Sequence, residues 1–171
     1  MFDLNVYDKS VALANSKERN AIMPLLSWDI YSVFFRNLKG VHADFSHLEQ
    51  MSSLYKWNLN LDLLKELKDN DAIIVTNADL KIEFASQGIA AMSGYQPLEV
   101  VGNSPKMFQG KNTSVEKRAQ INLAIATQKP FEATLVNYKK NGEQYDCHIR
   151  SFPIFDKKGQ LTHFIALEKA A

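Results

Sequence analysis

The sequence predicts an α+β protein, with a five-stranded antiparallel sheet that carries short helices on one face and follows an α-helical N-terminal extension. Turn residues mark the division, because six of the seven glycines and four of the five prolines lie from residue 71 onward. Before that point apolar residues recur at helical spacing, and after it short apolar runs alternate with turns. We therefore divide the chain into an extension, residues 1–70, and a domain, residues 71–171.

The composition is that of a protein with a packed core. Of the 171 residues, 46% are hydrophobic and 23% are charged, which excludes a wholly disordered chain. The formal charge of +1 provides no basic excess for binding nucleic acid or an anionic membrane. Cys147 is the one cysteine, so no internal disulfide can form, and the sequence has neither a secretory signal nor an apolar run of about 18 residues. We expect a cytoplasmic protein.

Three helices are expected in the extension. The first follows Pro24 and ends before Gly40, the second begins near Asp44, and the third begins near Asn60. Their apolar side chains recur at the spacing that is typical of a helix packed against other elements. In the first two helices these residues are Leu26, Ile30, Phe34 and Leu38, then Phe45, Leu48, Met51 and Tyr55.

Five strands and three helices are expected in the domain. The strands cover residues 72–76, 81–85, 131–140, 143–155 and 160–169. Turn residues at 77–79, 140–142 and 156–159 make hairpins, so the last three strands form an antiparallel meander. The helices lie between the second and third strands, at residues 88–93, 97–101 and 114–128.

One stretch of the domain carries a specific motif. Residues 94–110 read G-Y-Q-P-L-E-V-V-G-N-S-P-K-M-F-Q-G, which resembles the signature G-Y-x-x-x-E-V-x-G-x-N-C-R-F-L-Q-G of the LOV branch of the PAS domain family. Residues 136–142 and 163–166 resemble the last three strands of that branch. The resemblance covers about residues 71–169 and implies the PAS fold; it does not explain the extension.

The resemblance implies a site for flavin mononucleotide (FMN), because LOV domains bind this cofactor. A cysteine in the motif forms a light-driven adduct with the flavin ring, but Pro105 stands at that position, so the adduct is excluded unless Cys147 reaches the ring. Lys106 replaces the first phosphate-pairing arginine and keeps its charge, and Gln109 is retained. Asn122 replaces the second such arginine, so phosphate binding is half preserved.

The residues that correspond to the edge of the flavin ring are also changed in part. Asn137 is retained, whereas Cys147 replaces a second asparagine and Glu168 replaces a glutamine. An ionised carboxylate only accepts hydrogen bonds, so Glu168 repels the carbonyl oxygens of a flavin unless it is protonated. FMN is therefore disfavoured, and no cofactor is assigned.

Strand alternation predicts two faces of the sheet. The pocket face carries Ala133, Leu135, Asn137, Cys147, Ile149, Ser151, Phe164, Ala166 and Glu168. The opposite face carries Val136, Tyr138, Phe152, Ile154, Ile165 and Leu167, which is too much apolar surface for an open sheet. We expect the extension, or the same residues of a second subunit in a homodimer, to cover this face.

Signatures of catalysis and metal binding are missing from the sequence. The four histidines lack the spacing of metal or haem ligands, and no nucleophile elbow, phosphate loop or zinc-protease motif occurs. We expect no metal and no enzymatic activity.

These features predict a PAS sensory module that binds a small ligand, or senses the state of its pocket, and signals through contacts with an unidentified signalling protein. Two alternatives stay open. One is a ligand-free interaction or dimerisation module whose pocket is filled by its own side chains. The other is a LOV-like flavoprotein that lacks the photoactive cysteine and acts as a redox or light sensor.

Overall fold

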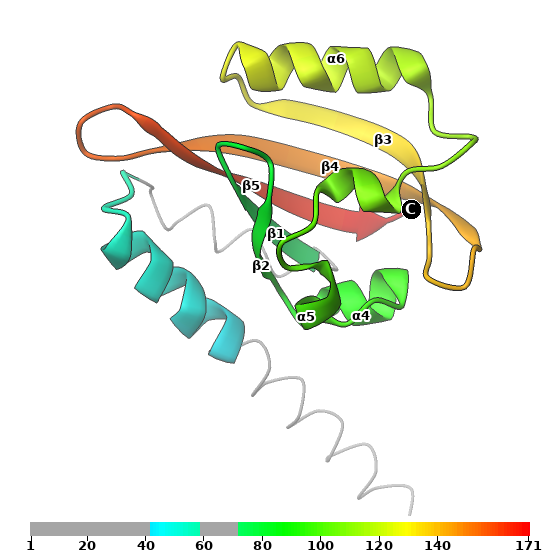
Figure 1. Cartoon of the computed structure of the whole chain (residues 1–171), viewed down its shortest axis with the longest axis horizontal. Helices are drawn as coiled ribbons and strands as arrows, with labels where there is room; N and C mark the ends of the chain where they lie inside the picture. The colour runs from blue at the N-terminus through cyan, green and yellow to red at the C-terminus, as the bar shows by residue number, and fades with distance from the viewer. Residues whose placement is uncertain (1–41, 59–71) are drawn as a thin grey trace, which may run out of the picture. The chain divides into compact units, whose positions relative to one another are not determined.

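A five-stranded antiparallel sheet forms the centre of the part of the chain that the computed structural model describes, residues 42–58 and 72–171 (Figure 1). Its order is β2-β1-β5-β4-β3. This arrangement confirms the predicted α+β fold and the meander of the last three strands. The strands are β1 (Ala72–Asn77), β2 (Ile82–Ala85), β3 (Phe131–Tyr138), β4 (Gln144–Phe155) and β5 (Leu161–Ala170).

Side chains in the predicted turns close two of the hairpins. Between β1 and β2, Asn77 Oδ1 accepts hydrogen bonds from the backbone N–H groups of Asp79 and Lys81, both at 3.0 Å. Between β4 and β5, Asp156 Oδ1 accepts from two backbone N–H groups at 2.8 and 2.9 Å, and Gly159 follows with φ +77°. Such short polar side chains and left-handed glycines are the chemistry that tight turns require.

The helices between β2 and β3 are α4 (Gly88–Ser93), α5 (Pro97–Val100), η2 (Pro105–Phe108) and α6 (Val115–Ala126). Ser114 caps α6, since its hydroxyl accepts from the backbone N–H of Lys117 at 3.2 Å. The short 3-10 helix η2 was not predicted, because a single turn has no periodicity to detect. Ser104 at its N-cap and Pro105 in its first turn stabilise it. In Figure 1, α6 runs along β3.

Both faces of the sheet are covered, which explains why four consecutive residues of β1, Ala72 to Val75, are all buried. On the inner face, Ala72 and Ile74 join a cluster with α4 and η2 residues. On the outer face, Ile73 and Val75 join a second cluster. The inner cluster contains Ile82, Ile89, Met92, Phe108 and Cys147, and the outer cluster contains Leu48, Met51, Trp57, Ile154, Ile165 and Leu167.

Residues 42–54 are helical and pack on the outer face of the sheet. Leu48 and Met51, two of the predicted apolar positions, are 1% and 6% exposed. Asp44 Oδ2 accepts from the backbone N–H of Gln87 at 3.0 Å, which ties this helix to the segment before α4. The expected helices at 24–40 and from Asn60 lie outside the described residues, so the packing of the whole extension stays a prediction.

The six predicted outer-face residues separate into two groups. Ile154, Ile165 and Leu167 are buried in the outer cluster, and Phe152 packs against it. Val136 and Tyr138 lie outside that cluster because they are on β3, an edge strand that β4 separates from β5. There the Val136 carbonyl accepts from the Thr113 hydroxyl at 2.6 Å, and the Tyr138 hydroxyl accepts from the Asn112 backbone at 2.9 Å.

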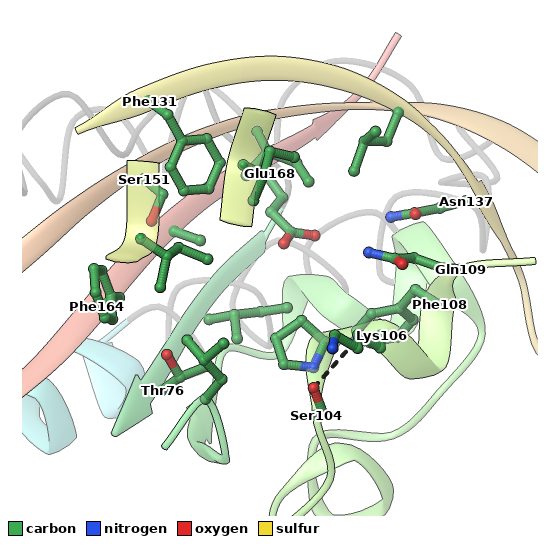
Figure 2. A pocket seen from close by; sticks show the side chains of 18 of the residues that line it. Thr76, Ser104, Lys106, Phe108, Gln109, Phe131, Asn137, Ser151, Phe164 and Glu168 are labelled. Atoms are coloured by element: carbon green, nitrogen blue, oxygen red, sulfur yellow. Dashed lines mark hydrogen bonds between the residues drawn. The ribbon is translucent and has the colours of Figure 1, made fainter. Parts of the chain in front are cut away.

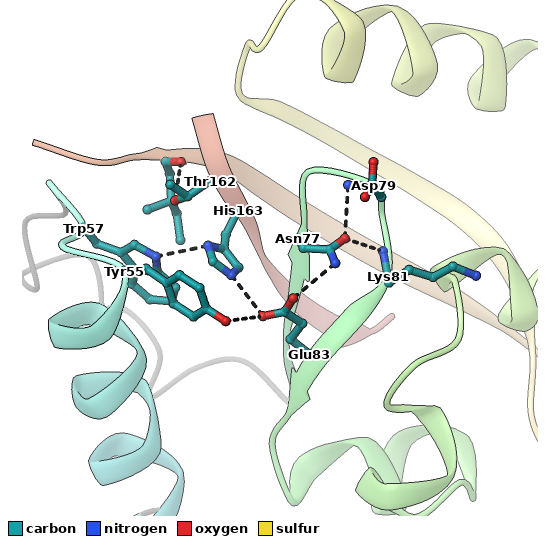
Figure 3. Close-up of polar contacts among 9 residues, drawn as sticks. Tyr55, Trp57, Asn77, Asp79, Lys81, Glu83, Thr162 and His163 are labelled. Atoms are coloured by element: carbon teal, nitrogen blue, oxygen red, sulfur yellow. Dashed lines mark hydrogen bonds and ion pairs between the residues drawn. The ribbon is translucent and has the colours of Figure 1, made fainter. Parts of the chain in front are cut away.

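A polar cluster joins the end of the 42–58 segment to the outer face (Figure 3). Trp57 Nε1 donates to His163 Nδ1 at 3.1 Å, and His163 Nε2 lies 3.1 Å from Glu83 Oε2. Because indole can only donate, His163 accepts at Nδ1 and donates from Nε2, which is the neutral tautomer. Tyr55 also donates to Glu83, and Asn77 donates to its other oxygen, both at 3.1 Å. Partial burial acts to raise the pKa of Glu83. Hydrogen bonds from His163, Asn77 and Tyr55 outweigh this effect and hold the pKa of Glu83 below its usual value.

We predict that Leu48→Ala lowers the free energy of unfolding by about 2–5 kcal/mol, because it leaves a cavity between the helix and the sheet. Leu54→Ala, on the same helix but at a position that is 72% exposed, is the matched control and should change it by less than about 0.5 kcal/mol. Urea denaturation followed by far-UV circular dichroism measures both. Equal changes in the free energy of unfolding for Leu48→Ala and Leu54→Ala would contradict the packing of Leu48 between the helix and the sheet.

Candidate ligand-binding site

A cavity of about 100 Å³ lies between the inner face of the sheet and the segments η2 and α6 (Figure 2). A volume of about 10–15 Å³ already holds one water molecule, so this space is much larger than a water site. Ile74, Thr76, Leu135 and Ile149 contribute from the strands, and Ile121 contributes from α6. The lining is mostly apolar with a few polar groups, which is the usual character of a small-molecule site.

Ten of the eleven predicted pocket residues line this cavity. The exception is Cys147, which is fully buried in the inner core cluster. Whether the ten residues bind a ligand stays a prediction. They are Pro105, Lys106, Gln109, Asn122, Leu135, Asn137, Ile149, Phe164, Ala166 and Glu168.

Eight further lining residues were missed by the sequence reasoning. Strand alternation could have identified Ile74 and Thr76 on β1, whereas it did assign Ser151, which also lines the cavity, to the pocket face with Ile149. Helical spacing could have identified Ile121 and Ile125, which lie one turn apart on α6. The remaining residues are Leu80, Ser104, Phe108 and Phe131, whose positions depend on how loops fold over the sheet.

Glu168 brings a buried carboxyl group to the cavity wall. Its side chain comes from β5, is 4% exposed and points into the cavity in Figure 2. Burial raises the pKa of Glu168 to about 7, and a hydrogen bond from the Cys147 thiol, 3.5 Å from Oε2, opposes this only in part. Near neutral pH a large fraction of this carboxyl group therefore holds a proton and can donate a hydrogen bond.

Two amide side chains face the cavity from the side opposite Glu168 in Figure 2. Asn137 is 3% exposed, and within the described part of the chain its Oδ1 has no hydrogen-bond partner. Gln109, at the end of η2, points toward it. A buried polar atom without a partner costs about 1–3 kcal/mol, so a ligand that donates to Asn137 would relieve this cost.

A second cavity of about 260 Å³ adjoins the first and shares Lys106, Gln109, Ile121 and Asn122 with it. Arg118 also lines this second cavity, and its Nε is buried without a hydrogen-bond partner among the described residues. The sequence analysis identified only one cationic group here, Lys106, because Asn122 stands at the position that corresponds to the second phosphate-pairing arginine. Arg118 lies one helical turn earlier on the same side of α6, so the i, i+4 spacing could have identified it.

Residues 42–58 and 72–171 contain no group of three or more His, Cys, Asp or Glu side chains that is arranged to hold a metal ion. No helix in the same residues is long and apolar enough to cross a bilayer. The two cavities present hydrogen-bonding and charged groups around an apolar space.

Comparison with known families identifies the domain. The model of the PAS domain family matches residues 70–169, so the chain belongs to this family of sensory signalling domains. A blue-light-activated histidine kinase of Brucella ovis is 32% identical over 97 residues, which cover 55% of this chain and 20% of that protein. Protein TWIN LOV 1 of Arabidopsis thaliana is 35% identical over 88 residues, which cover 51% of this chain and 22% of that protein.

The predicted resemblance to the LOV branch is thus confirmed. The chain spans only about a fifth of the length of these two relatives. The dark structure of the blue-light photoreceptor Aureochrome1 LOV has the same fold, with a TM-score of 0.61, 22% identity, and coverage of 67% of this chain and 86% of that chain.

We predict that Glu168→Gln removes a pH-dependent loss of stability. Because burial raises this pKa from its ordinary value of 4.5 to about 7, the unfolded chain loses the proton first, and wild-type stability falls as the pH rises from 4.5 to 7. This shift of the pKa corresponds to about 3 kcal/mol in the free energy of unfolding. The stability of the variant relative to wild type should therefore grow by an amount of this order between pH 4.5 and pH 7.5 in urea titrations. A difference in stability between Glu168→Gln and wild type that does not change with pH would show that the carboxyl group of Glu168 has its ordinary pKa.

Proposed function

We propose that this PAS domain is a sensor that responds to the binding of a small molecule with a polar planar edge and an anionic end, such as FMN. The observation that carries the proposal is that Asn137 Oδ1 in one cavity and Arg118 Nε in the adjoining one are both buried without a hydrogen-bond partner among the described residues. The third such atom in these residues, the Tyr145 hydroxyl, lines neither cavity. A single ligand that spans both cavities would supply a donor to Asn137 Oδ1 and an acceptor to Arg118 Nε.

The residues of the two cavities fit FMN at both ends. Asn137 and Gln109 provide amide groups for the edge of the ring system, and Lys106 and Arg118 provide cationic groups for the phosphate. Flavin, when bound, supplies visible-light absorption and reversible reduction. The blue-light function named for the Brucella relative supports this choice of ligand class.

The site differs from a thiol-dependent light sensor. Pro105 lines the cavity, and the Cys147 thiol is directed to Glu168 rather than into the space. Among the described residues no thiol faces the cavity, so the ligand is held without a covalent bond. The sensor therefore reports occupancy, or the electronic state of the ligand, through hydrogen bonds.

Strand β5 provides the route from the cavity to the outer face. Its residues alternate, so Ala166 and Glu168 line the cavity while Ile165 and Leu167 belong to the outer cluster. A small shift of β5 on ligand binding therefore changes the surface on which the 42–54 helix packs. The receiver is a signalling protein or a second copy of the chain, and the module itself is non-enzymatic and cytoplasmic.

The first test is the absorbance of the purified protein from about 300 to 500 nm, followed by titration with FMN and riboflavin. We expect Arg118→Gln to weaken FMN binding by about tenfold, the effect of losing roughly 1.4 kcal/mol from a charge-assisted contact, and to leave riboflavin binding unchanged. Lys129→Gln, which removes an exposed cation beyond α6, is the control.

Failure of the wild-type protein to bind either flavin, with no small molecule released on denaturation, would contradict the ligand proposal. The outer apolar face would then favour the ligand-free interaction module. Equal losses of FMN and riboflavin in Arg118→Gln would instead show that Arg118 supports the fold of the site.

The polar cluster on the outer face makes a separate prediction. Trp57→Phe removes the donor to His163 Nδ1, leaving a buried acceptor unpaired, and should speed amide hydrogen exchange in residues 42–54 by about tenfold. Tyr55→Phe removes a more exposed hydrogen bond to Glu83 and should have a smaller effect. Exchange that is unchanged in Trp57→Phe would show that the polar cluster does not hold the helix on the sheet.

A further inference from the structure

Glu168 has an unusual environment for a carboxyl group. It pairs in register with Ala72 on β1 and Ile149 on β4, two apolar residues. The hydrogen bond that its carboxyl group accepts comes from the Cys147 thiol, a weak donor, at 3.5 Å. The remainder of the group points into the cavity (Figure 2).

The charged and titratable groups around Glu168 are few. From β4 come Cys147 and Tyr145, and from η2 comes Lys106, which lines the same cavity but is solvent-exposed. Burial raises the pKa of the Tyr145 hydroxyl, and the nearby Cys147 and Glu168 act in the same direction, so this phenol stays neutral. β3 contributes the neutral Asn137 and β1 the apolar Ile74. Within residues 42–58 and 72–171, no cationic side chain forms an ion pair with Glu168, and the titratable group that donates a hydrogen bond to it is a thiol.

The protonation state of Glu168 changes what the cavity can bind. A protonated carboxyl group donates one hydrogen bond and suits a ligand edge that presents a carbonyl oxygen. The ionised group only accepts, so it repels a carbonyl oxygen and suits an edge that presents N–H donors. The protonation state of Glu168 therefore determines whether the cavity favours a ligand edge with a carbonyl oxygen or one with N–H donors.

We propose that Glu168 is a specificity-determining residue that admits a carbonyl-edged ligand only while it holds a proton, so that occupancy of the cavity depends on both ligand and pH. This inference rests on the proposed function, because FMN presents carbonyl oxygens at its ring edge. The raised pKa of about 7 places the transition near neutral pH.

The test is titration of wild type and Glu168→Gln with FMN at pH 6 and pH 8. If only the protonated state binds, the apparent dissociation constant of wild type rises about tenfold over this interval for a pKa of about 7. Glu168→Gln, which donates from its amide at both pH values, should bind without pH dependence and about as tightly as wild type at pH 6. Riboflavin in parallel removes the titration of the phosphate, whose second pKa is about 6.

Cys147→Ala distinguishes the carboxyl group from the thiol. It removes a hydrogen bond that lowers the pKa of Glu168, so the pH dependence should persist and its midpoint should move to higher pH. Loss of the pH dependence in this variant would assign the titration to the thiol and overturn the inference. Thermal unfolding of each variant at both pH values confirms that the compared proteins are folded.

The two proposals fail in different ways. Wild-type binding of FMN and riboflavin that is the same at pH 6 and pH 8 would overturn the role of Glu168 and leave the flavin sensor in place. Absence of binding by wild type and by Glu168→Gln at both pH values would overturn the flavin sensor and, with it, the role of Glu168.

Discussion

The burial of both faces of β5 is the constraint on which the rest of the structure depends. This strand pairs with β1 on one side and β4 on the other, so neither edge is exposed. Its alternate residues therefore belong to two different environments, the cavity on the inner face and the apolar cluster under the 42–54 helix on the outer face. A packed interior transmits small displacements because it has no space to absorb them. In this way the strand order itself makes the cavity and the outer surface interdependent.

Local sequence patterns were sufficient for the five strands, for α4, α5 and α6, and for the cavity residues on β4 and β5, although they missed η2 and the cavity residues on β1. The two-residue period of a strand assigns Leu135 to the same face as Asn137 on β3, and Ala166 to the same face as Glu168 on β5. The caps and turns follow from equally local chemistry, as with Ser114 before α6 and Asn77 at the end of β1. What these patterns have in common is that the interacting residues are separated by a few positions.

Features that depend on long-range packing could not be predicted in the same way. The hydrogen bond from Trp57 to His163 joins residues 106 positions apart, and nothing in the sequence around either residue indicates the other. Arg118 is a mixed case, because the i, i+4 spacing from Asn122 could have identified its side of α6, whereas its relation to Lys106 depends on how α6 lies against η2. Side-chain parity assigned Cys147 to the pocket face, but it could not show that the thiol lies in the inner cluster and donates to Glu168 instead of lining the cavity.

Most of the positions in the described residues that violate the usual rules of a protein interior lie at the two cavities. Asn137 Oδ1 and Arg118 Nε are buried without partners, as is the Tyr145 hydroxyl outside the cavities, and Glu168 is a buried carboxyl group that accepts a hydrogen bond from a thiol. Each of these features lowers the stability of the unliganded domain, and such costs persist at functional sites where a ligand or a change of state relieves them. The outer face, by contrast, satisfies its buried histidine fully, through Trp57 on one ring nitrogen and Glu83 on the other. The unsatisfied groups of the two cavities thus lie on the face where we propose that a ligand binds, and not on the face that holds the helix, and β5 joins the two faces.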